Sequence, residues 1–399
     1  MKPLRYFTFL FILSAIPTSA FAATVNDPLF AQQWSLRQTH VPAAWDITMG
    51  DPAVVVAVID TGIDMNQPEF ANAIWTNPYE IAGNGIDDDN DGYIDNVHGW
   101  NFVNDSPDTQ PMKVMHQLDE SYSHGAAVAS IIAARANDRY GMAGVAPNVQ
   151  ILPITVLDGD GFGANNNLAS AIRYATAKNV RIMNISVTGF EDNDEVRFAL
   201  YEAQQRGIVI VAAVGNSGAV EGQNLDEVSV YPACNGKDTK TSTFIRVTGT
   251  DSIDQHAPHA NFGASCTDIA APGHELIGAH PLDLPSGSEE TETYTHVAGL
   301  TGTSVASPMV AGTAALIASA NPKLTGAEIR QVLLTTTDSI EPGIAPGQKG
   351  QLGYGRLNAE KALKKALLST ASLAGSQSVK PAIGQEPQWG RVFRFWLGR

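Results

Sequence analysis

Short runs of branched apolar residues alternate along the chain with longer segments in which apolar and polar positions follow the period of a helix. A short, continuous apolar run is typical of a strand that is covered on both faces. Because strand and helix alternate, the pattern predicts an α/β fold, a three-layer sandwich with a mostly parallel central sheet and helices on both faces. We expect strands at residues 54–59, 151–156, 182–185, 208–214 and 245–248, and helices at 125–136, 167–178, 194–206, 304–320 and 325–335.

One domain, residues 23–370, accounts for this alternation, and no internal repeat interrupts it. In an open sheet of this kind, ligands bind beyond the carboxyl ends of the strands, so polar residues that follow the apolar runs are the candidates for chemistry. Near the end the composition turns to Ser, Gln, Pro and Gly, which predicts a flexible tail over residues 371–399. The tail ends in an aromatic group of Trp389, Phe393, Phe395 and Trp396.

The first residues predict a signal peptide, residues 1–22. Lys2 and Arg5 precede the apolar run 7–16, and residues 20–22 have the small-x-small pattern that a signal peptidase accepts. We expect cleavage after residue 22 or 23, and a secreted or periplasmic protein. An uncleaved membrane anchor is the alternative, but the apolar run is shorter than the roughly twenty residues that span a bilayer. We expect no later segment to be long and apolar enough to span a membrane.

The overall charge bears on possible partners. The chain of 399 residues holds 41 acidic and 25 basic side chains, for a net charge of -16. This balance argues against nucleic-acid binding, because phosphate contacts need clustered Lys and Arg. Export bears on the two cysteines, because an oxidising compartment allows Cys234 and Cys266 to persist as a disulfide. Two separate buried thiols are the alternative.

Four polar residues stand at the ends of predicted elements. Asp60 ends an apolar strand, His124 begins a helix, Ser304 opens another helix, and Asn216 follows a strand. A serine hydroxyl becomes a nucleophile when an imidazole accepts its proton, and a carboxylate fixes the tautomer of that imidazole. Each residue alone is more often a cap or turn residue. Together they predict a catalytic triad of Asp60, His124 and Ser304, with Asn216 as an oxyanion donor beside a helix N-terminus.

These segments resemble the subtilisin-like serine proteases, the subtilases, in which aspartate, histidine and serine follow in this order. The resemblance runs from about residue 26 to about residue 362, and it is most specific at 58–64 and 302–312. It is weaker after the His-Gly pair, where Ala126 and Ala127 replace the usual threonine and histidine. It implies a serine endopeptidase that works through an acyl-enzyme intermediate. We expect polypeptide substrates and a monomer.

The resemblance also places a substrate cleft. Two segments resemble the strands that hold the substrate on either side, so a peptide would bind as an added β-strand. Thr188 and Val230 stand where the family usually has glycine, which predicts a narrow pocket and a small residue before the cut bond. The predicted cleft residues are Ser186, Val187, Thr188, Gly189, Gly161, Phe162, Gly163 and Val230.

An acidic run at residues 87–95 predicts a calcium loop. Carboxylates occupy alternate positions, with a glycine at the sharp turn. His98 stands where an EF-hand has its glutamate, but some subtilisin-like proteases resemble this insert and use it for calcium. A solvated acidic loop is the alternative. The predicted ligands are Asp87, Asp89, Asp91 and Asp95 through their side chains and Tyr93 through its carbonyl.

The family's strong calcium site implies a second ion, bound by Asp27, Glu69 and Asp138 in the loop 135–142. Plain capping and surface roles are the alternative for these residues. Residues 26–30 already resemble a mature N-terminus without a preceding pro-region, so we expect refolding to depend on calcium. Two other readings compete: a subtilisin-like scaffold that binds peptides without cutting them, and a lipase-type hydrolase. The second fails because Ser304 lacks the Gly-x-Ser-x-Gly setting.

Overall fold

The computed structural model describes residues 25–112, 120–235, 242–282 and 295–373 of the 399 residues. The predicted signal peptide lies outside the described residues. So do residues 374–399, which hold most of the predicted tail and its aromatic group. The first three residues of the predicted tail, 371–373, are the end of a helix.

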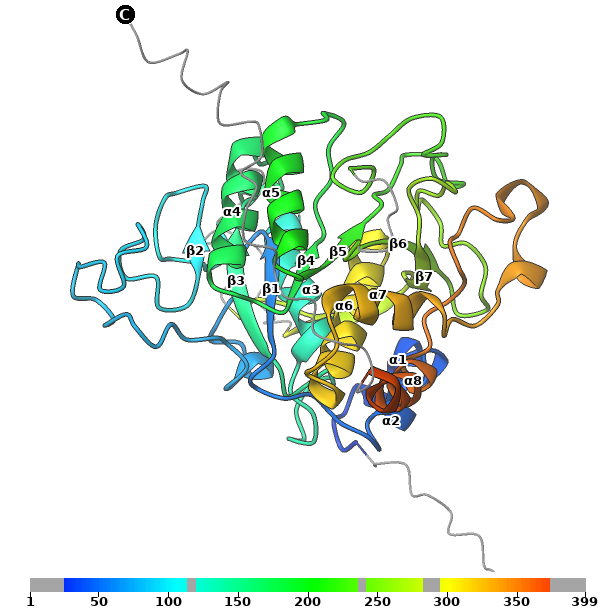
Figure 1. The fold of residues 1–399 in the computed structure, drawn as a ribbon, viewed down its shortest axis with the longest axis horizontal. Helices are drawn as coiled ribbons and strands as arrows, with labels where there is room; N and C mark the ends of the chain where they lie inside the picture. The colour runs from blue at the N-terminus through cyan, green and yellow to red at the C-terminus, as the bar shows by residue number, and fades with distance from the viewer. Residues whose placement is uncertain (1–24, 113–119, 236–241, 283–294, 374–399) are drawn as a thin grey trace, which may run out of the picture.

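A seven-stranded parallel sheet forms the centre of the molecule, with the order β2-β3-β1-β4-β5-β6-β7 (Figure 1). The strands β2 and β3 lie on one side of β1, and the strands β4 to β7 lie on its other side. The crevice at such a switch in strand order is where an open sheet binds ligands, and β1 ends there in Asp60. The strands are β1 Val55–Asp60, β2 Trp100–Asn101, β3 Gln150–Thr155, β4 Ile182–Ile185, β5 Val209–Ala213, β6 Phe244–Thr250 and β7 Ile269–Pro272.

Helices cover both faces of the sheet, which confirms the predicted three-layer α/β fold. Alternate residues of β1 enter different cores: Val56 and Val58 pack with α3 and α6, and Ala57 and Ile59 pack with α4 and α5. A strand buried on both faces reads as a continuous apolar run for this reason. The helices are α1 Trp34–Gln38, α2 Val41–Ala44, α3 His124–Ala133, α4 Asn165–Ala177, α5 Asp194–Gln205, α6 Thr303–Ala320, α7 Gly326–Leu334 and α8 Ala359–Leu373.

All ten predicted strands and helices are present, with no boundary more than three residues from its predicted position. The elements that were not expected are β2, β7, α1, α2, α8 and the antiparallel hairpin of β8 (Leu276–Ala279) and β9 (His296–Leu300). Short 3₁₀ helices also occur, at Phe30–Gln32, Pro68–Phe70, Glu120–Ser123, Glu341–Gly343 and Pro346–Gln348. Several of the missed elements are very short, and β7 contains alanines and a proline, which have low strand propensity.

The helix α6 corrects one expectation, that no segment after the signal peptide is long and apolar enough to span a membrane. Its 18 residues have a mean hydropathy of 1.3 and pass that test by length and composition. In the structure, however, 83% of this helix is buried. It packs against β4 to β7 on one side and against α3, α7 and α8 on the others. A helix enclosed on all sides is apolar around its whole circumference.

Candidate active site

Asp60 and His124 meet at the carboxyl edge of the sheet. Asp60 is the last residue of β1 and is fully buried, and His124 is the first residue of α3. The distance between His124 Nδ1 and Asp60 Oδ1 is 2.7 Å. Asp60 Oδ1 also accepts a hydrogen bond from the backbone N–H of Thr61 at 2.8 Å. The carboxylate therefore holds the imidazole at Nδ1, which leaves Nε2 to act on another group.

The start of α3 lies against the turn that follows β1. A Cβ on Gly125 would lie 2.3 Å from the carbonyl oxygen of Gly62, so no larger residue fits at this position. Gly62 has a φ of +105°, in the region that favours glycine. The Oγ1 of Thr61 accepts a hydrogen bond from the N–H of Gly125 at 3.0 Å. These contacts fix the position of the His124 ring relative to Asp60.

Two opposing effects set the pKa of His124. Burial lowers this pKa, and the charge and the hydrogen bond of Asp60 raise it. Together the two effects of Asp60 are larger, so the pKa of His124 lies above its ordinary value of 6.5. The imidazole next to Asp60 is therefore a stronger base than a free histidine.

Ser304 lies in the first turn of α6, and the end of β4 anchors this turn. The carbonyl oxygen of Ser304 accepts a hydrogen bond from Ser186 Oγ at 3.0 Å. One turn further along α6, Ser307 Oγ donates to Asn184 Oδ1 at 2.8 Å. The N-terminus of a helix carries unpaired N–H groups and a positive potential. Ser304 is thus held where a developing negative charge is stabilised.

Asn216 lies just beyond the end of β5 and contacts the start of α6. Its Oδ1 accepts a hydrogen bond from the N–H of Thr303 at 3.0 Å, and Thr303 Oγ1 accepts one from the N–H of Gly215 at 2.9 Å. A Cβ on Gly302 would lie 2.9 Å from Asn216 Nδ2, so glycine leaves room for this amide. With Oδ1 used as an acceptor, Nδ2 has no hydrogen-bond partner among the described residues, so its two N–H groups remain as donors beside the start of α6.

The structure pairs His124 with Asp60 but does not pair it with Ser304 in the same way. Among the described residues, no hydrogen bond joins Ser304 Oγ to the His124 ring. Catalytic hydrogen bonds of this kind are often long before a substrate binds. The helices α3 and α6, which carry the two side chains, pack against each other.

Comparison with known proteins decides the family. The model of the subtilase family matches residues 51–360 of this chain. The chain belongs to the subtilase family. It is 32% identical to thermitase from Thermoactinomyces vulgaris over 342 residues, and the aligned region covers 86% of this chain and 99% of thermitase. It is 31% identical over 331 residues to subtilisin BL from Lederbergia lenta, covering 83% of this chain and 98% of that one.

Solved structures agree with this assignment. The structure described as proteases from Pseudoalteromonas arctica PAMC 21717 aligns with a TM-score of 0.66 and 25% identity, over 86% of this chain and 100% of that chain. The expected resemblance is thereby confirmed. This subtilase is a serine endopeptidase.

The two segments predicted to flank the substrate line one cavity of about 310 Å³ in this subtilase. Residues 161–163 form a turn after β3, in which the N–H of Asp158 donates to the carbonyl of Phe162 at 2.8 Å. Residues 187–189 follow β4 and form the opposite wall. Ser186 does not line the cavity, because its hydroxyl turns to the start of α6.

Val230 does not line this cavity either. It is only 4% exposed and packs with Val214, Leu225, Ala233 and Cys266 in a small core of its own. Its apolar side chain gains more from that core than from an exposed wall. Of the two residues that were predicted to narrow the pocket, only Thr188 lies on this cavity wall.

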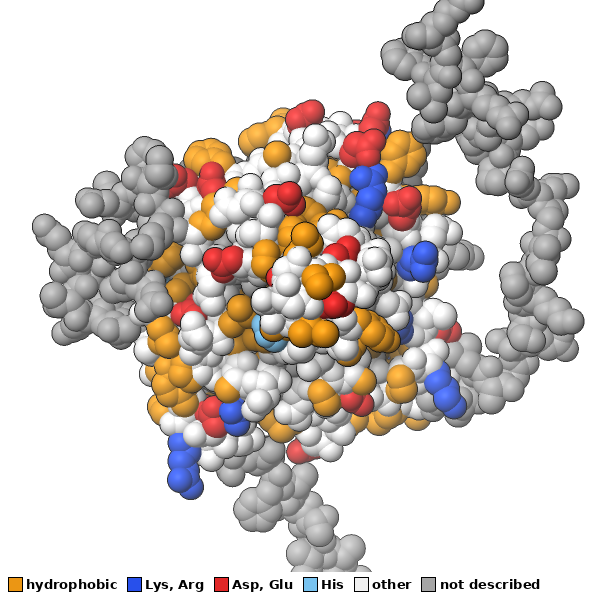
Figure 2. All heavy atoms as spheres, turned by 90° about the vertical axis from the view of Figure 1, so that its left-hand side faces the viewer, with side chains coloured by type: hydrophobic (Ala, Val, Ile, Leu, Met, Phe, Trp, Pro, Cys, Tyr) orange, Lys and Arg blue, Asp and Glu red, His pale blue; other side chains and the backbone are white. Residues whose placement is uncertain are grey.

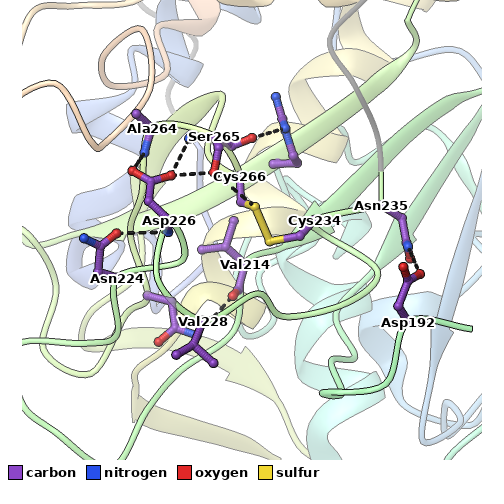
Figure 3. The surroundings of a disulfide bond; sticks show 12 residues. Asp192, Val214, Asn224, Asp226, Val228, Cys234, Asn235, Ala264, Ser265 and Cys266 are labelled. Carbon is purple, nitrogen blue, oxygen red and sulfur yellow. Dashed lines mark hydrogen bonds between the residues drawn. A yellow bond between two sulfur atoms is a disulfide. The ribbon is translucent and has the colours of Figure 1, made fainter.

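A disulfide joins Cys234 and Cys266, whose Cα atoms are 5.0 Å apart (Figure 3). The loop around Cys234 forms part of the cavity wall, through Tyr231 and Asn235. Tyr231 also exchanges two backbone hydrogen bonds of 2.8 Å with Gly189. The disulfide therefore braces one side of the cleft.

The acidic loop, residues 80–98, brings three carboxylates together. Glu80, Asp87 and Asp89 offer ligand atoms that all lie within 4.8 Å of one another. Oε2 of Glu80 and Oδ1 of Asp89 are buried and have no hydrogen-bond partner among the described residues. Calcium prefers such carboxylate oxygens, so these three residues fit a calcium ion. Figure 2 shows this side of the molecule, where acidic side chains lie between hydrophobic ones.

Sequence reasoning missed Glu80, because it precedes the alternating acidic run. Asp91 and Asp95 lie outside the group of three, although all four aspartates have protein partners. Lys178 Nζ lies 2.5 Å from Asp91 Oδ2 and 3.1 Å from Asp89 Oδ2. The carboxylate of Asp95 accepts hydrogen bonds from the N–H groups of residues 84 and 85, at 3.1 and 3.0 Å. The structure thus brings Asp87 and Asp89 together and leaves Asp91 and Asp95 out of the group.

Tyr93 connects the acidic loop to the body of the protein. Its ring packs edge-on against Trp100, Phe102 and Tyr174, with centroid distances of 5.0, 5.8 and 4.9 Å. Edge-to-face packing of this kind is favourable beyond the area that it buries. The role that the structure gives to Tyr93 is therefore anchoring by its ring.

At the second predicted calcium site, the expected segments meet but their carboxylates do not gather. Asp27 accepts hydrogen bonds from two N–H groups of the loop 135–142, at 2.9 and 3.1 Å. Glu69 is fully buried, and its Oε1 lies 2.5 Å from His296 Nε2. Burial raises the pKa of Glu69, and His296 acts in the opposite direction. Of the residues that the structure describes, Asp27, Glu69 and Asp138 do not form a group within 4.8 Å.

Proposed function

We propose that this subtilase cleaves polypeptides with Ser304 as the nucleophile, His124 as the general base and Asp60 as the group that orients His124. The observation that carries the proposal is the 2.7 Å contact between His124 Nδ1 and the buried Asp60, at the sheet edge where α6 begins. The order of the three residues along the chain is that of the family.

The reaction follows from the roles of these groups. Ser304 Oγ attacks the carbonyl carbon of the peptide bond while His124 Nε2 accepts its proton. Asp60 stays ionised and stabilises the imidazolium. The oxyanion accepts hydrogen bonds from Asn216 Nδ2 and from N–H groups at the start of α6. His124 then protonates the leaving amine, and water hydrolyses the acyl-enzyme by the same path.

The substrate binds as an added β-strand between residues 161–163 and 186–189. Among the described residues, the N–H of Gly163 and both backbone groups of Thr188 have no hydrogen-bond partner. An extended peptide satisfies such groups and gains its affinity from them. Thr188 stands on one wall of the cleft where the family has glycine, which favours a small residue at the one position directly before the cut bond and leaves the aromatic rim of Phe162 and Phe190 to other positions of the peptide. A peptide library that is cut fastest after Phe or Tyr would contradict this preference.

A fluorophosphonate probe tests the nucleophile, because it reacts with activated serines. We expect the probe to label the wild-type chain and not the Ser304→Ala variant. Ser319→Ala, near the other end of α6, is the matched control and keeps the label. A wild-type chain that binds peptides but takes no label would instead support the scaffold that binds without cutting.

Calcium is the second part of the proposal. Glu80, Asp87 and Asp89 would hold the ion, which supplies no catalytic step but neutralises three carboxylates of the folded chain. Because the ion binds the folded state, it shifts the folding equilibrium toward that state. We expect the refolding yield to fall in excess chelator. Equal refolding yields with calcium and with chelator would contradict the proposed role of calcium.

The third part concerns location. Removal of residues 1–22 on export delivers the chain, as a monomer, to a compartment outside the cytoplasm. There the disulfide between Cys234 and Cys266 forms and persists. N-terminal sequencing of the exported protein is expected to begin at Ala23 or Thr24. An exported chain that still begins at Met1 would contradict the cleavage.

A further inference from the structure

The cavity of the cleft has buried apolar residues in its wall and an aromatic rim. Leu168, Val187 and Val196 are at most 8% exposed and line it from α4, from the segment after β4 and from α5. Phe162 and Phe190 also line it, and they are 75% and 76% exposed. Two phenylalanines that face water above buried apolar side chains favour an apolar or aromatic side chain in this part of the cavity.

The rim also carries a negative charge. Glu191 lines the cavity, and its Oε2 accepts a hydrogen bond from Asn165 Nδ2 at 2.8 Å. Among the described residues, no cation pairs with Glu191. A carboxylate in this position attracts a basic side chain that approaches together with an aromatic one. The chemistry of the cavity therefore matches an extended peptide in which aromatic and basic residues alternate.

The chain itself contains such a peptide. Residues 389–399 read Trp-Gly-Arg-Val-Phe-Arg-Phe-Trp-Leu-Gly-Arg. The segment 374–399 has four basic residues and one acidic residue, a net charge of +3 in a chain of net charge -16. In an extended strand, Phe393 and Phe395 lie on the same side, and Arg394 lies between them on the other.

The segment is also long enough to reach the cleft. Fifteen residues, 374–388, separate the end of α8 from Trp389. Fully extended, they span about 50 Å. A domain of this size has a radius of gyration of about 20 Å, so a tether of this length reaches across it.

We infer that residues 389–396 of this chain bind in the cavity of its own cleft and compete with the substrate. The inference rests on the proposed function, because it assigns the cleft to extended peptides. Bound there, the aromatic side chains of the segment cover Phe162 and Phe190, and an arginine pairs with Glu191. The segment acts as a tethered, reversible inhibitor.

The first experiment compares the full-length wild-type chain with a variant in which Trp389, Phe393, Phe395 and Trp396 are replaced by serine. The effective concentration of a tethered ligand is in the millimolar range. A segment that binds with an affinity a few times tighter than that raises the apparent KM about fivefold. We expect the variant to have a correspondingly lower KM and the same kcat. Equal KM values in the two proteins would overturn the inference.

The second experiment adds a synthetic peptide of residues 389–399 to the serine variant. We expect competitive inhibition of the initial rate, and none from a peptide with the four aromatic residues replaced by serine. Phe190→Ala weakens the inhibition at least severalfold. Phe198→Ala, a matched control on α5 that is 61% exposed and does not line the cavity, leaves it unchanged. Inhibition that is equally strong in the Phe190→Ala variant, or that is not competitive, would overturn the inference.

Two further readouts separate the possible failures. Inhibition in the wild-type chain that grows with enzyme concentration would show binding between two copies and would overturn the tethered form. Fluorophosphonate labelling of Ser304 reports on the proposed function independently of KM. If Ser304 is labelled and the KM is unchanged, only the inference about residues 389–396 is wrong. If Ser304 is not labelled, the proposed function is wrong.

Discussion

The carboxyl edge of the sheet and the acidic loop differ in the charge of the groups that surround their carboxylates. At the edge, one carboxylate, Asp60, faces one imidazole at 2.7 Å. In the loop, three carboxylates, Glu80, Asp87 and Asp89, face one another within 4.8 Å. A carboxylate and an imidazole compensate each other's charge, whereas clustered carboxylates repel unless a cation or protons neutralise them. Asp60 thus has its charge partner within the protein. In the loop, Lys178 reaches Asp89, but among the described residues no cation pairs with Glu80 or Asp87.

Because of this difference, we expect substitutions in the two regions to affect different properties of the protein. Substitutions at the edge lower turnover and leave any effect of calcium on stability in place. Substitutions in the loop remove the effect of calcium and leave the chemistry of the folded enzyme in place. The following experiments test this separation.

The largest effect is expected from Asp60→Asn. The amide keeps the shape of the carboxylate but favours the wrong tautomer of His124, so kcat falls by about 10⁴-fold, the loss known for this change in a Ser-His-Asp protease. The measurement is kcat on a peptide substrate, with thermal unfolding followed with and without calcium. A kcat near that of the wild type would remove Asp60 from the triad, and a lost calcium effect would break the separation.

A smaller loss is expected from Asn216→Ala. Without its Nδ2 donors the oxyanion loses a hydrogen bond, and kcat falls about 100- to 1000-fold, as for the corresponding donor in a subtilisin. KM stays the same, because the donor acts mainly in the transition state. Asn166→Ala on the exposed side of α4 is the control. A change in KM alone would show that Asn216 positions substrate and does not stabilise the oxyanion.

In the acidic loop, the pair of substitutions Glu80→Gln and Asp87→Asn removes two of the three charges. At a calcium concentration 100 times its dissociation constant, the ion stabilises the wild-type chain by about 2.7 kcal/mol, and the variant gains nothing. Denaturant unfolding in calcium and in chelator measures this difference, and Glu221→Gln in another exposed loop is the control. If calcium stabilises the variant as much as the wild type, the ion binds elsewhere.

The smallest effect concerns pH. The base form of His124 is neutral, and its pKa is raised above 6.5, so kcat/KM falls as the pH drops through a midpoint above 6.5. The pairing of His124 with Asp60 stabilises the fold fully below 6.5 and is lost as the pH rises through the raised pKa. A pH–rate profile measures the midpoint, and Asp60→Asn is expected to lower it. A wild-type midpoint below 6.5 would contradict the raised pKa.

Much of the fold was predictable from the order of residue types. The five predicted strands are buried on both faces, so their apolar runs are continuous and easy to recognise. The residues of the predicted triad stand at the ends of such elements, where the topology of a parallel sheet brings them to one edge. Strands as short as β2 do not produce a pattern, because two residues cannot show a period.

The sequence by itself determined the layered α/β fold, the family and the candidates Asp60, His124, Asn216 and Ser304. Only the tertiary structure decided which group stands opposite each remaining side chain. Glu80 lies with Asp87 and Asp89, and Lys178 pairs with Asp91. His296 contacts Glu69, which is 227 residues away in the sequence, and Val230 packs in a small apolar core. The physical reason is that a strand or helix imposes a repeating pattern on its own residues. A contact between distant loops depends on where the whole chain places them.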